Sequence, residues 1–224
     1  MNQGIFGLPP NNKIGYDTPA LLHPLAYVDV MNSSLGGTSQ TLYYMPYGFQ
    51  AVGSTITVAA NTLYLNAFWI GKPAIVKYIS IRSAAPTVAG NLKYSFYDSE
   101  STTGLPNKLL FSSVSVARAA GYGYTTVYTA HALKIDKPGF YWVGTVFDAA
   151  IDNLERPSGS GANPFPSTGT LANYQGYGVS TGLTFGDPPS SCEGVKFTLL
   201  DSGTTPLSQL VMTSQLQNIT VQKG

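Results

Sequence analysis

Short runs in which apolar residues alternate with polar ones occupy the middle of this chain, and they restrict it to folds built from strands. The clearest run places Leu92, Tyr94 and Phe96 on one side and Lys93 and Ser95 on the other. Alternation with a period of two is typical of a half-buried antiparallel strand. Similar runs, separated by turn-forming residues, continue to about residue 200, and none carries an apolar stripe at helical spacing beyond one or two turns. The pattern predicts an all-β fold, a sandwich or a barrel.

The run 140–147 is apolar on both sides, so we expect it to cross the middle of the core with Trp142 buried in it. Trp69 is also expected in the core. Each of the other expected strands has one apolar side: Leu63, Leu65, Ala67 and Trp69; Ile75, Ile79 and Ile81; Leu110, Val114 and Val116; Val127, Leu133 and Ile135; Val195, Phe197 and Leu199.

The composition agrees with strands and excludes several partners. Charged residues make up 10% of the chain, against about 25% in ordinary soluble domains, and solvated helix faces need them. The 12 basic and 11 acidic residues are spread thinly and give a net charge of +1. Without a basic stripe to neutralise phosphates, no nucleic-acid partner is expected. A net charge near zero favours association with other proteins.

Neither a membrane nor an oxidising compartment is indicated. No run of 18 apolar residues occurs, so we expect no membrane-spanning segment, and the opening MNQGIFGLPPNN lacks the basic and apolar regions of a secretory signal. Cys192 is the single cysteine, so it has no partner for an intrachain disulfide or a zinc cluster.

The pattern divides the chain into an N-terminal arm at 1–54, a sandwich at 55–205 and a tail at 206–224. The arm is rich in proline and glycine, and we expect it to be extended and to pack on another subunit rather than to be disordered. Its candidate assembly residues are apolar: Leu21, Leu22, Leu25 and Tyr27. For the tail two alternatives remain: a short helix around Leu207, Leu210 and Val211, or a final strand at 216–222.

A long stretch rich in Gly, Pro, Ser and Asn, 148–193, is expected to be mostly loop, although 174–185 has some strand character. Its aromatic residues Phe165, Tyr174 and Tyr177 are the candidate contacts to a receptor or partner, because tyrosine among small polar residues offers rigid amphipathic contact area. The alternative is that these rings cover the edge of the sandwich or pack on a neighbouring subunit.

No set of residues predicts catalysis or a cofactor. The segment 178–182 matches the Gly-x-Ser-x-Gly nucleophile elbow, but no histidine follows Ser180, so we interpret the match as chance. His23 and His131 are far apart and do not have metal-ligand spacing. A calcium site at Asp148 and Asp152 is conceivable, although no spaced acidic ladder supports it. We therefore expect no enzyme, no cofactor and no metal.

Three short patterns carry a resemblance to a known family. They are Tyr97–Asp98, then Gly104–Leu105–Pro106 followed by Leu109, and then Gly139–Tyr141–Trp142 within an aromatic strand. Together the stretch 61–148 resembles the jelly-roll domains of tailed-phage virion proteins, the tail-fibre and head-fibre components. The resemblance implies a jelly-roll sandwich similar in shape to carbohydrate-binding modules, and a structural or adhesive role, with no defined ligand site.

From this resemblance we expect a non-enzymatic virion protein, made in the bacterial cytoplasm and assembled with other virion proteins. A tail appendage that contributes to assembly and attaches to the host surface, with a surface glycan as a candidate partner, is the preferred hypothesis. A capsid decoration or head-fibre protein that stabilises the head is the alternative, and a stand-alone carbohydrate-binding module is the third. The fibre analogy also implies a homo-oligomer, a trimer.

Overall fold

The computed structural model describes residues 41–44, 46, 51–118, 121–158, 177–200 and 205–214. In these residues the alternating runs pair into two antiparallel sheets, and no helix occurs. Residues 1–40, which form most of the expected arm, lie outside the described residues. In chain order the strands are β1 (Thr41–Tyr44), β2 (Ala51–Val58), β3 (Leu63–Ile70), β4 (Ala74–Ala84), β5 (Gly90–Ser99), β6 (Pro106–Ser112), β7 (Val116–Arg118), β8 (Tyr122–Ile135), β9 (Gly139–Phe147), β10 (Ile151–Ser158), β11 (Tyr177–Ser180), β12 (Thr198–Leu200) and β13 (Ser208–Ser214).

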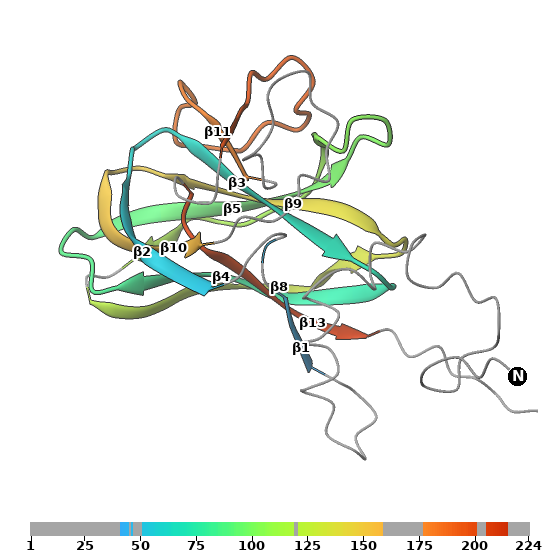
Figure 1. The fold of residues 1–224 in the computed structure, drawn as a ribbon, viewed down its shortest axis with the longest axis horizontal. Helices are drawn as coiled ribbons and strands as arrows, with labels where there is room; N and C mark the ends of the chain where they lie inside the picture. The colour runs from blue at the N-terminus through green and yellow to red at the C-terminus, as the bar shows by residue number, and fades with distance from the viewer. Residues whose placement is uncertain are drawn as a thin grey trace, which may run out of the picture.

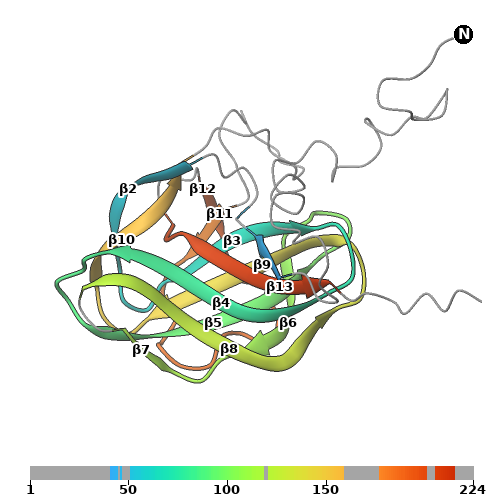
Figure 2. The same cartoon turned by 90° about the horizontal axis from the view of Figure 1, so that it is seen from below.

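The strand order is that of a jelly roll. In sheet A, β2 pairs with β10, β10 with β4, and β4 with β8. In sheet B, β3 pairs with β9, β9 with β5, and β5 with β6. The chain crosses between these two four-stranded groups so that the sheets stack face to face, as Figures 1 and 2 show. The expected all-β, jelly-roll-like sandwich is confirmed, and the run 140–147 lies in the middle of sheet B as β9.

Five further strands lie outside the eight of the jelly roll. β11 pairs with the edge of β3, and β12 pairs with β11. β13 pairs with β4 beside β10, and β1 pairs with β13. The short β7 pairs with β5. The segment 208–214, which the sequence left open, is therefore a strand of sheet A.

β10 occupies part of the stretch 148–193 that the composition predicts to be loop. Its pairing with β2 contains two register shifts, and it includes Pro157, which cannot donate to a ladder. These bulges break the alternation, so that the buried Ile151 and Leu154 are three residues apart instead of two. The loop interpretation of 151–158 was wrong because bulged strands lose the period on which it relied.

The main core lies between the sheets. It contains Leu92, Tyr94 and Phe96, as the alternation predicts, together with Ile79 and Ile81 from β4. Ile75, predicted to share their face, is only half-buried. Lys77 is the extra residue of a bulge against β13, where Val76 and Tyr78 face consecutive residues. The bulge reverses the alternation, so Ala74 and Val76 take the inward positions that the sequence pattern assigned to Ile75.

A second apolar cluster lies on the outer face of sheet B. Trp142, Leu63, Leu65 and Tyr97 point to this side and are buried, with Trp142 fully inaccessible as predicted. The segment 181–197, which we call the strap, covers them with Leu183, Cys192 and Phe197 (Figure 1, orange, above β3 and β9). Both faces of sheet B are thus buried, which explains why β9 is apolar on both sides.

Backbone hydrogen bonds hold the strap at two sides of sheet B. Beside β3 the Leu183 N–H donates to the carbonyl of Asn61 at 3.2 Å. At the edge strand β6 the Cys192 N–H donates to the carbonyl of Asn107 at 2.7 Å, and the Leu109 N–H donates to the carbonyl of Ser190 at 3.0 Å. The strap therefore crosses sheet B from β3 to β6.

Three predicted core residues lie elsewhere. Leu110 and Val114 are 41% and 78% exposed. Leu110 is the extra residue of a bulge in β6, whose neighbours Leu109 and Phe111 pair with Tyr97 and Phe96, and Val114 lies beyond the end of β6. Trp69 is half-buried at the rim, where its ring meets Phe140 edge-on at a centroid distance of 4.9 Å.

Candidate functional site

The outer face of sheet A carries the most distinctive exposed side chains of the described residues. Tyr122, Tyr124 and Tyr128 on β8 are 67%, 56% and 48% exposed, and Tyr78 on β4 is 39% exposed. They point outward because their neighbours along each strand, such as Thr125 and Val127, point into the core. We call these four tyrosines together with Arg82 the tyrosine face.

Pairing between β4 and β8 sets the geometry of the tyrosine face. Tyr78 pairs with Tyr128, Arg82 pairs with Tyr124, and Ala84 pairs with Tyr122. The rings of Tyr78 and Tyr128 are tilted by 39° with their centroids 5.2 Å apart. The face therefore has two aromatic platforms, one formed by Tyr78 and Tyr128 and one formed by Tyr122 and Tyr124.

Arg82 supports the second platform. Its guanidinium carbon lies 5.7 Å from the ring centroid of Tyr122 and 5.8 Å from that of Tyr124, which is cation–π distance for both rings. Its Nη2 donates to the Tyr122 hydroxyl at 2.5 Å, and its Nε lies 3.2 Å from Oε2 of Glu155. The hydrogen bond to Tyr122, and then the charge of Glu155, raise the pKa of Arg82. Arg82, whose charge is paired with Glu155, thus holds the second platform in place.

Sequence reasoning missed this face, although a signal was present. The prediction that Val127, Leu133 and Ile135 form the inner side of a strand implies that Tyr122, Tyr124 and Tyr128 lie on the outer side. Between Val127 and Leu133 the strand also bulges: residues 129–132 stand opposite Lys77 alone, and Ala130 has a φ of 53°.

The contact residues predicted from the sequence are not brought to this face. Phe165 and Tyr174 lie outside the described residues, and so do Leu21, Leu22, Leu25 and Tyr27 of the arm. Tyr177 begins β11 on sheet B, where its backbone pairs with Asn66 and Leu200, and its side chain is outside the description. These assignments stay predictions.

The acidic pair considered for calcium has other roles. The carboxylate of Asp148 accepts hydrogen bonds from the backbone N–H and the side-chain amide of Asn91, at 2.7 and 2.6 Å. The carboxylate of Asp152 accepts from the hydroxyl and N–H of Thr87 and from the N–H of Val88, and the Thr87 hydroxyl is the main cause of its lowered pKa. Each carboxylate thus holds a different segment, that of Asp148 at Asn91 and that of Asp152 at Thr87 and Val88. Nowhere in the described residues do three or more His, Cys, Asp or Glu side chains gather to hold a metal.

Ser180 of the Gly-x-Ser-x-Gly match is buried at the end of β11, on a strand paired with β3. The following residues through 190 contain no helix, so the strand–turn–helix geometry of a nucleophile elbow is not formed there. His131 lies within β8, and its side chain is outside the description.

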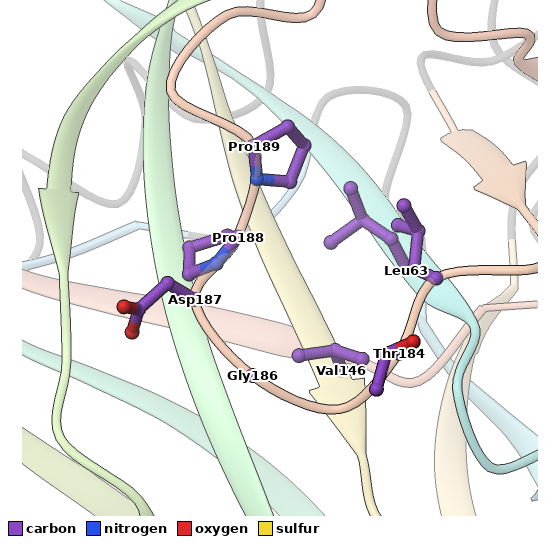
Figure 3. Close-up of a pocket in the computed structure, with 8 residues that line it drawn as sticks. Leu63, Val146, Thr184, Gly186, Asp187, Pro188 and Pro189 are labelled. Atoms are coloured by element: carbon purple, nitrogen blue, oxygen red, sulfur yellow. The ribbon is translucent and has the colours of Figure 1, made fainter.

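Two hollows lie along the strap. The smaller, about 30 Å³, lies between Leu63 and Val146 of sheet B and the strap residues Asp187, Pro188 and Pro189 (Figure 3), and is large enough only for a water or two. The larger, a shallow groove of about 410 Å³, lies between the β5–β6 turn and the strap, with Glu100 and Glu193 at its margin. The two carboxylates of this groove are exposed and the other lining residues are neutral, so we propose no catalytic or binding role for it.

Cys192 reports on whether the strap stays closed. It is 5% exposed, and burial raises the pKa of its thiol to about 12 from an ordinary value of 9.0. At pH 8 the folded chain therefore holds about a thousandfold less thiolate than the unfolded chain. We expect a thiol reagent to label Cys192 at least a hundredfold more slowly in buffer than in urea. Equal labelling rates in both would contradict the closed strap.

No protein-family model matches this chain, and no curated protein is significantly similar to it. Within the described residues no helix is long and apolar enough to span a bilayer.

Proposed function

We propose that this chain is a non-enzymatic structural protein of a tailed-phage virion, a tail appendage that contributes to particle assembly and contacts the host surface through the tyrosine face. The observation that carries the contact role is the exposure of four tyrosines on two paired strands of one sheet. Exposed aromatic clusters are typical of binding surfaces, because each ring left in water forgoes the free energy of burial.

The fold supports the proposal by analogy. Jelly rolls serve as capsid and lectin domains, which build particles and bind sugars. A fold hosts many functions, so this argument gives a class and no mechanism. The resemblance of 61–148 to tail-fibre and head-fibre domains points in the same direction. In this proposal the arm anchors the chain to other virion proteins, and the chain forms a trimer.

Two measurements on particles and cells test the proposal. Antibody labelling of intact virions is expected to mark the tail. Purified protein is expected to bind host cells, with binding reduced by Tyr124→Ala and unchanged by Val114→Ala, which truncates an exposed residue between β6 and β7 that is not part of the tyrosine face.

The outcomes separate the alternatives. Labelling over the whole head would replace the tail appendage with a capsid decoration protein. Absence from the particle combined with binding to glycans would replace it with a carbohydrate-binding module. A monomer at micromolar concentration on a sizing column would contradict the trimer.

A further inference from the structure

The exposed apolar residues of the described chain differ by location. Those on β4 and β8 are all tyrosines, whereas the aliphatic ones lie on other segments: Val52, Val88, Leu110 and Val114. A tyrosine presents a flat apolar ring and a hydroxyl tip at low entropic cost. The tyrosine face is therefore both apolar and rich in hydroxyls, and it lacks the aliphatic side chains that protein interfaces commonly bury. A sugar ring has the matching surface, a C–H face bordered by hydroxyl groups.

Charge indicates the kind of sugar. Arg82 is the one charged member of the tyrosine face, and Glu155 neutralises it at 3.2 Å. Binding a polyanion requires unpaired Lys or Arg side chains, which this platform does not supply. Of the lysines on these strands, Lys77 is the extra residue of the bulge next to Tyr78 and Lys134 lies beyond the bulge, and neither belongs to the platform that Arg82 supports. A guanidinium has five N–H donors, more than its contacts with Tyr122 and Glu155 require, so donors remain for sugar hydroxyls.

Spacing indicates the length of the ligand. Tyr124 and Tyr128 are four residues apart on β8, so the two platforms are about 13 Å apart along the strand. Thr126, exposed between them, pairs with Ser80 and keeps the intervening surface low and polar. One sugar ring covers a single platform, while a chain of several rings reaches both. Engaging both platforms with one molecule raises the affinity without any new kind of contact.

We propose that the tyrosine face binds a neutral linear polysaccharide lying along β8, with sugar rings stacked on both platforms and hydroxyls bonded to Arg82. The inference rests on the proposed function and specifies the class of its host-surface ligand.

The test is isothermal titration of the full chain with maltohexaose, cellohexaose, mannohexaose and hexa-N-acetylchitohexaose as neutral probes and hexagalacturonate as the acidic one. At least one neutral hexasaccharide is expected to bind, and its disaccharide at least tenfold more weakly. Tyr124→Ala and Tyr128→Ala are each expected to weaken binding about three- to tenfold. Tyr124→Phe retains the ring and most of the affinity, and Val114→Ala changes nothing. Chemical-shift mapping on the unaltered protein gives the same answer if an alanine variant fails to fold.

Three results would overturn the inference. The first is no binding of any neutral probe at millimolar concentration. The second is binding of the acidic probe alone. The third is self-association of the chain that Tyr124→Ala abolishes, which would assign the face to a second copy. These failures are distinct from failure of the proposed function, because tail labelling of virions and Tyr124-dependent binding to host cells would persist without oligosaccharide binding.

Discussion

Replacing Tyr94 with phenylalanine is expected to lower the free energy of unfolding by about 2–5 kcal/mol, because it leaves two buried backbone groups without a partner. Tyr94 belongs to β5 of sheet B and is fully buried between the sheets. Its hydroxyl accepts a hydrogen bond from the Ile81 N–H at 3.0 Å and donates one to the Thr125 carbonyl at 2.5 Å. Ile81 and Thr125 are register partners on β4 and β8, so one hydroxyl from sheet B completes a ladder position of sheet A.

Urea unfolding followed by tryptophan fluorescence measures the effect. Tyr141→Phe is the matched control, since it also removes a hydroxyl that donates to a backbone carbonyl, that of Lys137 at 2.8 Å, but this hydrogen bond is exposed and the side chain is only half-buried. The control is expected to change the unfolding free energy by less than about 0.5 kcal/mol. If both variants unfold at the urea midpoint of the unaltered protein, the backbone groups of Ile81 and Thr125 find other partners and the Tyr94 hydroxyl adds no stability.

Because Tyr94 is buried, the free energy of unfolding is expected to fall as the pH rises above about 10. Burial raises the pKa of Tyr94 far above its ordinary value of 10.0, and it also raises the pKa of Tyr97. Above about pH 10 the unfolded chain has released these protons while the folded chain keeps them, so the folded state binds more protons. Stability from these groups is fully present below that pH and is lost as the pH rises, by about 1.4 kcal/mol per pH unit for each tyrosine. Tyr94→Phe is expected to reduce this slope by one such contribution.

Strands with regular pairing were predictable from the sequence, whereas two of the bulged strands, β4 and β10, were not. β5 and β9 pair over seven positions without a register shift, so the period of two survives and Leu92, Phe96 and Trp142 were placed correctly. In β4 one extra residue, Lys77, exchanges the two faces, and no local pattern marks it. In β10 two register shifts break the period altogether. Period-based reasoning thus fails where a bulge exchanges the two faces or breaks the period, whereas the bulge of β8 leaves Val127 and Leu133 on the same side.

The candidate site was predictable only in part, for a different reason. The tyrosines of β8 have a clear period, but their platforms depend on pairing with Tyr78 and Arg82, some 40 residues earlier in the chain. The strap shows the same limitation. Its sequence up to residue 193 is rich in Gly, Pro and Ser and predicts loop, which is correct for its backbone. The strand expected from Val195 begins only at Thr198. The strap nevertheless buries one face of sheet B. Partners that are distant in sequence, rather than local propensity, determine both features.

Replacing Trp142 with alanine is expected to cost about 3–5 kcal/mol and to release the strap from sheet B. Trp142 is fully buried and belongs to the same outer cluster as Leu65, Tyr97 and Cys192. Its indole Nε1 donates to the Gly104 carbonyl at 2.9 Å, which fixes the β5–β6 turn at the margin of the same cluster. Removing the ring empties the space on which the strap packs.

Two readouts separate loss of the strap from general destabilisation. Cys192 is expected to react with a thiol reagent in the Trp142→Ala variant under conditions where circular dichroism still reports the sandwich. Trp69→Ala is the control, because it removes the same ring from the neighbouring strand at a half-buried rim position, and it is expected to cost less than half as much and to leave Cys192 protected. Unchanged protection of Cys192 in Trp142→Ala would mean that the backbone hydrogen bonds to Asn61 and Asn107 hold the strap without the cluster. In that case the hydrogen bonds would determine the position of the strap, and packing on the apolar outer face of sheet B would not.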